Sequence, residues 1–268
     1  MRPSLVRLLV LGSGAALVSG CDLSTDPEYL QQTFGLITVS ATQVTSGVYA
    51  TPARGEFFRG AVGALPNVDN SRADTCFVAP IQSIQTPGLA TNVRDLDAGA
   101  QVGLKLGDDE HALVPTNVGS RRIYAPSGTR LSYTPGDSVV VTIPGNASGY
   151  PAQTIRGKTA EAFDIDPVVQ PAIGDPVRLE WTQPEDNNSA FVVLLRYAAE
   201  GSTTINRQVA CGFIDDGVAA ISPQFANAWS QSTNKDWVAY RLRTTRALVA
   251  DGALQITSLF QRPTPAAN

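Results

Sequence analysis

Apolar and polar residues alternate in short runs along most of the chain, which is typical of β-strands. From Val177 to Thr182 every second residue is apolar, with Val177, Leu179 and Trp181 on one side. This spacing predicts a strand with one buried face. The run Phe191–Tyr197 is almost continuously apolar, which favours a central strand covered on both faces. Together these patterns predict an all-β fold.

The first half of the chain is divided into runs of strand length by Gly, Pro, Asn and Asp. Such turn residues recur roughly every 8–12 residues, which favours a β-sandwich or a β-barrel, and of these we expect an antiparallel β-sandwich. The strands predicted here are Leu36–Ala41, Gly47–Thr51, Glu56–Ala64, Thr75–Ile81, Gln101–Leu106, Arg121–Ala125, Arg130–Thr134, Ser138–Ile143 and Gln153–Arg156.

In the second half of the chain, turn residues separate the predicted strands more clearly. A strand is predicted over Ile205–Phe213, followed by Asp215–Gly217, whose Asp-Asp-Gly sequence predicts a tight hairpin turn. Two further strands, Trp237–Thr245 and Ala253–Gln261, are joined across Asp251-Gly252.

One short helix is predicted near 223–230. Ser222 and Pro223 fit the N-cap and the first helical position. Phe225, Ala228 and Trp229 then fall on one face, so we expect that face to be buried.

The elements between Pro171 and Arg262 resemble an immunoglobulin or fibronectin-III β-sandwich in strand count and in one early buried Trp. The Cys…Trp…Cys spacing of true immunoglobulin domains is absent, so the resemblance concerns architecture only. Prolines and a glycine in Asp166–Gly174 predict a boundary. We therefore expect an N-terminal β domain over 34–166 and a C-terminal sandwich over 167–262. A single larger fold is the alternative.

Composition narrows the class of protein. The chain has 43% hydrophobic and 16% charged residues and a net charge of −4, which argues against a disordered chain. An acidic body lacks the basic face that binding to nucleic acid requires. We therefore expect no nucleic-acid partner.

The first residues have the organisation of an export signal. Arg2 and Arg7 provide positive charge, 8–18 is apolar and short, and small residues precede Cys21. The run Leu17-Val18-Ser19-Gly20-Cys21 resembles the lipobox of bacterial lipoproteins. This resemblance covers only the first 21 residues. An ordinary secretory signal beside a coincidental cysteine is the alternative.

The lipobox resemblance implies a signal peptide over 1–20, cleavage before Cys21, and a diacylglyceryl thioether on its sulfur. Several acyl chains would hold the protein at a membrane, facing the periplasm or the exterior. The polar segment after Cys21 contains Pro27 and predicts a tether over 21–33. The last residues, 263–268, are expected to form a flexible tail. The identity of the membrane stays open.

Two cysteines, Cys76 and Cys211, remain for the body. In an oxidising compartment they can form one disulfide. Buried free thiols are the alternative. Neither cysteine has a His or a basic residue near it in sequence to lower the thiol pKa, so a nucleophilic role is not expected.

Catalytic chemistry is not indicated. The single histidine, His111, follows Asp108, Asp109 and Glu110, a charged stretch best interpreted as a hairpin tip. A metal site there is disfavoured, because successive strand residues point to opposite faces. One His and two free Cys cannot make a zinc site of the usual type, and no phosphate-binding glycine motif is present. We expect no cofactor, no metal site and no enzymatic activity.

Two other kinds of chemistry stay open. Calcium needs only oxygens, and acidic pairs occur, but they lack the regular alternation of an EF-hand and fit turns. The pairs are Asp164/Asp166, Glu185/Asp186 and Asp215/Asp216. Among the tryptophans, Trp181 and Trp229 have core spacing, whereas Trp237 begins a strand and is the candidate for contacting a ligand such as a sugar.

The sequence therefore predicts a membrane-anchored, non-catalytic envelope lipoprotein with a structural, adhesive or partner-binding role. Its partners would be the membrane and an unknown protein or glycan. A carbohydrate-binding or glycoside-cleaving surface lipoprotein is the first alternative, because two nearby carboxylates suffice for such cleavage. A calcium-stabilised adhesion module is the second.

Overall fold

The structure is a computed structural model that describes residues 31–61, 74–81, 93–128, 131–249 and 251–262. Within these ranges the chain forms sixteen strands and one short helix, which confirms the all-β class. The elements are β1 Gln31–Thr45, β2 Val48–Ala50, β3 Ala53–Ala61, β4 Thr75–Pro80, β5 Arg94–Asp95, β6 Val102–Leu106, β7 Asp109–Val118, β8 Arg121–Pro126, β9 Ser138–Ile143, β10 Gln153–Lys158, β11 Val177–Glu180, β12 Ser189–Tyr197, β13 Arg207–Ile214, β14 Val218–Ile221, α1 Pro223–Gln231, β15 Lys235–Val249 and β16 Gly252–Arg262.

Most strands belong to one 14-stranded sheet with the order β10-β9-β6-β7-β8-β3-β1-β16-β15-β12-β13-β4, in which β2 also pairs with β1 and β5 with β3. Strands β11 and β14 form a separate pair. All described neighbours are antiparallel except β1 and β16, which run parallel with Ile37 opposite Ile256. The first and last described strands therefore lie side by side at the middle of the sheet.

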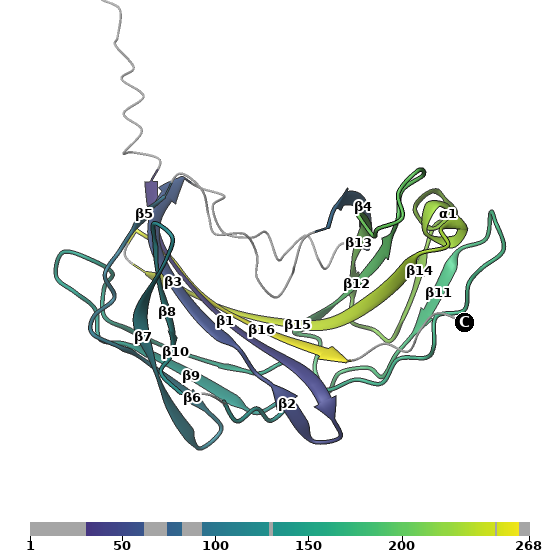
Figure 1. The fold of residues 1–268 in the computed structure, drawn as a ribbon. Coiled ribbons are helices and arrows are strands. Elements are labelled where there is room, and N and C mark those ends of the chain that lie inside the picture. The colour runs from purple at the N-terminus through teal and green to yellow at the C-terminus, as the bar shows by residue number, and fades with distance from the viewer. Residues whose placement is uncertain (1–30, 62–73, 82–92, 129–130, 250, 263–268) are drawn as a thin grey trace, which may run out of the picture.

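The large sheet is strongly curved and folds back on itself, which gives the sandwich architecture (Figure 1). Strand β10, at one end, contacts β15 and β16, so β6, β9 and β10 lie as a second layer against the convex face. Helix α1 lies against β12, β13 and β4 at the other end. The main core fills the space between these layers and includes Ile37, Phe57, Phe191 and Ile256.

The expected boundary near 166–174 is crossed by several contacts. Strand β1 pairs with β16, and β4, from the first half of the chain, pairs with β13 from the second. The division into domains over 34–166 and 167–262 stays a prediction, since sheet pairing alone does not show whether each part folds separately. The predicted tether overlaps the sheet slightly, because β1 already begins at Gln31.

Two predicted local features are wrong. Residues 131–134 of the expected strand Arg130–Thr134 are not in a strand. The turn at Asp215–Gly217 does not form a hairpin, because β14 pairs with β11 instead of β13. The reason is that the Asp215 side chain is buried and bonded to three other segments. The chain therefore leaves the large sheet at this point.

Helix α1 follows the predicted start. Ser222 is extended, with φ −62° and ψ 153°, and Pro223 begins the helix. The buried face differs by one position, because Ala226 and Trp229 are buried whereas Ala228 is exposed. The Trp229 Nε1–H donates to the carbonyl of Asp236 at 2.9 Å, which fixes the helix against the start of β15.

Candidate functional site

Among the described strands, the candidate for a binding site is the outer edge of β4. This strand ends the large sheet and pairs with β13 alone. Cys76 lies opposite Cys211, and the two sulfurs form a disulfide of 2.02 Å with a Cα–Cα distance of 4.1 Å. The predicted disulfide is therefore present, and it fastens the edge strand to its neighbour.

The pairing defines which backbone groups of β4 point outward. Directly opposite residues lie about 4.5 Å apart at a non-hydrogen-bonded pair and about 5.5 Å apart at a hydrogen-bonded pair. The 4.1 Å separation marks Cys76–Cys211 as a non-hydrogen-bonded pair. The amide and carbonyl groups of Cys76, and by alternation those of Val78, therefore point away from β13. Those of Phe77 and Ala79 point toward it.

The end of the ladder agrees with this alternation. The Ile214 N–H, two residues beyond Gly212 on β13, donates to Asp74 Oδ1 at 3.0 Å. Ile214 therefore directs its amide toward the β4 side, as a residue of the same parity as Gly212 should. Pro80 has no N–H, so it limits the outward donors at the far end of β4.

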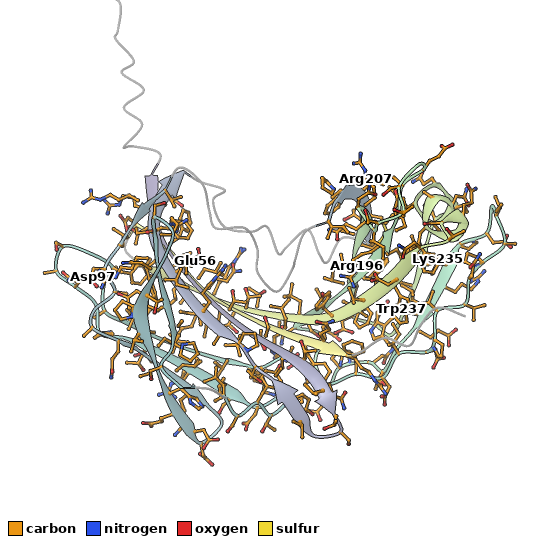
Figure 2. All side chains as sticks on the ribbon, viewed as in Figure 1. Glu56, Asp97, Arg196, Arg207, Lys235 and Trp237 are labelled. Carbon is orange, nitrogen blue, oxygen red and sulfur yellow. A yellow bond between two sulfur atoms is a disulfide. The ribbon has the colours of Figure 1, made fainter. Side chains whose placement is uncertain are left out.

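The side chains of β4 make this edge apolar on both faces. Phe77 is 58% exposed, Val78 51% and the following Ile81 41%. No charged residue occurs from Thr75 to Ile81. Charges lie only at the two ends, with Asp74 before the strand and Arg207 opposite Pro80. Arg207 lies at the rim of the curved sheet, beside β4 (Figures 1 and 2). Such an edge can accept an additional strand.

The core contains a buried ion pair between Arg241 of β15 and Asp215, which follows β13. Arg241 Nε and Nη2 donate to the two carboxylate oxygens at 2.7 and 3.0 Å. Both side chains are 1% exposed. The same carboxylate accepts from Trp181 Nε1 at 2.7 Å and Ser189 Oγ at 2.6 Å. Each carboxylate oxygen thus has two donors, so the buried charge is fully bonded.

Arg241 also joins the core to two distant segments. Its Nη1 donates to the Ala162 carbonyl at 2.9 Å, and its Nη2 donates to the Thr182 carbonyl. The guanidinium lies over the Phe163 ring at 5.5 Å. Because every part of this arginine is engaged, the cluster is structural and offers no group for chemistry.

The acidic pairs considered as calcium ligands are bonded to arginines in several places. Asp186 Oδ2 accepts from Arg243 at 2.6 Å, and this hydrogen bond lowers the pKa of Asp186. Asp164 pairs with Arg262, and Asp215 with Arg241. Across the described part of the chain, no group of three or more His, Cys, Asp or Glu side chains is placed to hold a metal ion.

A second ionic cluster lies on β3 (Figure 2). Glu56 is 3% exposed and lies 2.6 Å from Arg54 and 3.7 Å from Arg121. Arg121 also pairs with Asp95 at 2.6 Å. Burial raises the pKa of Glu56, although both arginines act in the opposite direction. The desolvation of this carboxyl group is therefore incompletely offset.

The tryptophans do not form a ligand platform. Trp181 stacks on Phe191 with ring centroids 4.0 Å apart, and Trp229 is fully buried. Trp237, the predicted ligand-contact residue, is 2% exposed and belongs to the main core. The expectation that Trp237 contacts a ligand is therefore corrected. The alternation along β15 places its side chain on the same buried face as Arg241.

His111 lies in the β6–β7 hairpin, opposite Leu104. His111 lines a surface pocket of about 820 Å³, together with residues that include Lys105, Glu110, Thr142 and Arg156. Its walls are mostly polar strand surface. The predicted hairpin is present, with Gly107 at φ 56° in the turn. Asp108, Asp109 and Glu110 are exposed around it.

Sequence reasoning missed the β4 edge as a site. One feature of the sequence could have indicated this edge: the run Thr75–Ile81 carries no charge and includes the large apolar residues Phe77, Val78 and Ile81. What the sequence lacked was the position of the strand at the end of the sheet. Cys21 lies outside the described residues.

Comparisons with protein-family models, curated proteins and solved structures give no match to this chain. Among the described residues, no helix combines the length and apolar character needed to cross a bilayer.

Proposed function

We propose that this protein is a lipid-anchored, non-catalytic protein of the cell envelope that binds a partner through the outer edge of β4. The observation that carries the proposal is the bond between Cys76 and Cys211. A structural disulfide is typical of exported proteins. It accounts for both body cysteines and leaves Cys21, with its lipobox-like context, for lipidation.

The position of the N-terminal end supports the anchor. Strand β1 begins at Gln31, and Thr33 lies opposite Gly252 at the β15–β16 turn. Ten peptide units separate Cys21 from Gln31, and at full extension they span at most about 35 Å. Acyl chains on Cys21 would therefore hold this end of the molecule close to the membrane surface.

That end has side chains suited to a lipid surface. Leu248, near the end of strand β15, is 88% exposed. Arg59 and Arg94, opposite each other on β3 and β5, are also exposed. Arg59 also pairs with Asp251 at 3.2 Å. An exposed apolar residue at the same end of the sheet as exposed arginines favours the interface of a membrane with anionic lipids.

The partner-binding role rests on the β4 edge. Outward backbone groups at Cys76 and Val78 and apolar side chains on both faces are the features of strands that accept another strand. The carbohydrate alternative is not favoured by any contact seen here, because Trp181, Trp229 and Trp237 are all buried.

The anchor is tested by expressing the full chain in a bacterium and measuring the mass of the product. We expect the wild type in the membrane fraction, beginning at Cys21 and carrying acyl groups. Cys21→Ser should lose both properties. Ser19→Ala, which keeps a small residue before the cysteine, is the matched control and should behave as the wild type. An unmodified wild-type chain that retains Met1 would overturn the proposal.

A further inference from the structure

We infer that the partner of the β4 edge is a second copy of this chain, added as an antiparallel strand with Phe77 at the two-fold axis. This inference rests on the proposed partner-binding role of that edge. The two β4 strands would join two 14-stranded sheets into one continuous sheet.

The outward backbone groups determine the register. A two-fold antiparallel pair requires that the bonding residues be placed symmetrically about its centre. Cys76 and Val78 are symmetric about Phe77, so Cys76 of one copy lies opposite Val78 of the other. This pairing gives four main-chain hydrogen bonds. The register shifted by one pair would place Cys76 opposite Pro80, which has no N–H to donate.

The side chains fit this register. Phe77 meets Phe77 of the second copy, and Thr75 lies opposite Ala79 on each side of it. The side chains at 75 and 79 are small, and the Phe77 ring between them is 58% exposed in the single copy. On the other face Val78 lies near the Cys76–Cys211 disulfide of the second copy. Aromatic and β-branched cross-strand pairs of this kind stabilise a sheet.

The charges at the two ends are complementary. The register puts Asp74 of one copy opposite Pro80 of the other, and Pro80 lies beside Arg207. Two strand spacings, about 10 Å, then separate the Cα atoms of Asp74 and Arg207 of the second copy. The long Arg side chain can reach across this distance to the Asp74 carboxylate, which keeps its hydrogen bond to the Ile214 N–H of its own copy. The symmetric arrangement produces the contact twice, and no charge from Thr75 to Ile81 opposes it.

The register is tested by cysteine crosslinking of the full chain, purified in detergent. The double variant Thr75→Cys/Ala79→Cys keeps Phe77 and places the two new thiols opposite each other in the dimer. Each single variant is a matched control, because position 75 never meets position 75 of the second copy, nor 79 its equivalent. Under mild oxidation we expect at least ten times more covalent dimer from the double variant than from either single variant. Peptide mapping checks that Cys76 remains bonded to Cys211.

A second measurement uses the unaltered edge. The wild type should dimerise in sedimentation, and Val78→Lys should weaken that association at least tenfold. Equal crosslinking of all three cysteine variants, or a wild type that stays monomeric at every soluble concentration, would overturn the self-pairing. Oxidation of the wild type reports separately on the anchor, because a covalent dimer through Cys21 would reveal a free thiol and overturn the lipid attachment instead.

Discussion

The two ends of the large sheet are built in opposite ways. Strand β10 exposes Arg156 and Lys158 and folds back onto β15, so closely that Gly157 leaves no room for a Cβ atom beside Thr245. Strand β4 lies at the rim, carries no charge and exposes Phe77 and Val78. One end has the charges and cover that prevent strand addition, and the described residues of the other end provide neither.

The difference is consistent with the docking role that we propose for the β4 edge. A short apolar edge strand is a risk of unwanted pairing, which proteins usually reduce with charges or cover. Here the edge strand is instead fastened by the Cys76–Cys211 bond. An uncharged edge fastened in this way is what the proposed docking role requires.

We expect the largest effect from a substitution in the buried Arg241–Asp215 ion pair, which lies in the core between the two ends of the sheet. Arg241→Leu removes the positively charged member of the pair and leaves the buried Asp215 carboxylate without its arginine. Leaving one buried charge unpaired costs about 3–5 kcal/mol. We expect a loss of this size in the free energy of unfolding, measured by urea denaturation. A loss below about 1 kcal/mol would show that the pair does not hold the two ends together.

The next effect is confined to the β4 end. The double variant Cys76→Ser/Cys211→Ser removes a bond that joins residues 135 positions apart. Closing so long a loop stabilises the fold by about 2–4 kcal/mol in most proteins. We expect a loss of this order, together with faster proteolysis near β4. Cleavage at the β10 end should not change, and equal loosening of both ends would contradict the account.

A third prediction exchanges the character of the two ends. Val78→Lys gives β4 the charge that β10 already carries, and we expect at least tenfold weaker self-association in sedimentation, about 1.4 kcal/mol. Thr154→Lys, at an exposed position of β10, adds the same charge at the other end and should leave the association unchanged. A similar loss in both variants would remove the distinction between the ends.

The smallest effect concerns Glu56 on β3. Its pKa is raised by burial, so folding favours the protonated form. The stability that this group contributes is fully present below its usual pKa of 4.5 and is lost as the pH rises through the folded value. Glu56→Gln should therefore gain stability relative to the wild type as the pH rises above this range, measured by thermal denaturation at several pH values.

Asp186, which precedes β12, gives the opposite sign and serves as the comparison. The Arg243 hydrogen bond lowers its pKa below 3.8. Its stabilising contribution is present above this usual value and is lost as the pH falls through the folded pKa. Asp186→Asn should therefore lose stability at neutral pH and converge with the wild type in acid. Parallel pH profiles for the two variants would be incompatible with the pKa shifts.

Local structure was largely predictable from the sequence. Ser138–Ile143 matches β9, and Ser222-Pro223 marks the start of α1, because turn residues and apolar spacing act over a few positions. The β7 strand was not predicted, since its start at Asp109-Glu110 is charged and resembles a turn. The cysteine pair was foreseen because only two cysteines remained for the body.

Long-range placement was not predictable. Nothing near Gln31–Thr45 indicates that it pairs in parallel with the last strand. Nothing in the sequence around Arg241 indicates its burial, because its partner Asp215 lies 26 positions away. Asp215 in turn was assigned to a turn on local grounds. The same limit applied to the site, since the exposure of Phe77 depends on which strand ends the sheet.

Residue-resolved amide hydrogen exchange at several protein concentrations tests the self-pairing of β4 most directly. The amides of Cys76 and Val78 should exchange quickly in dilute protein and at least ten times more slowly in concentrated protein, while Phe77 and Ala79 stay protected throughout. Exchange at Cys76 and Val78 that does not depend on concentration would contradict the account.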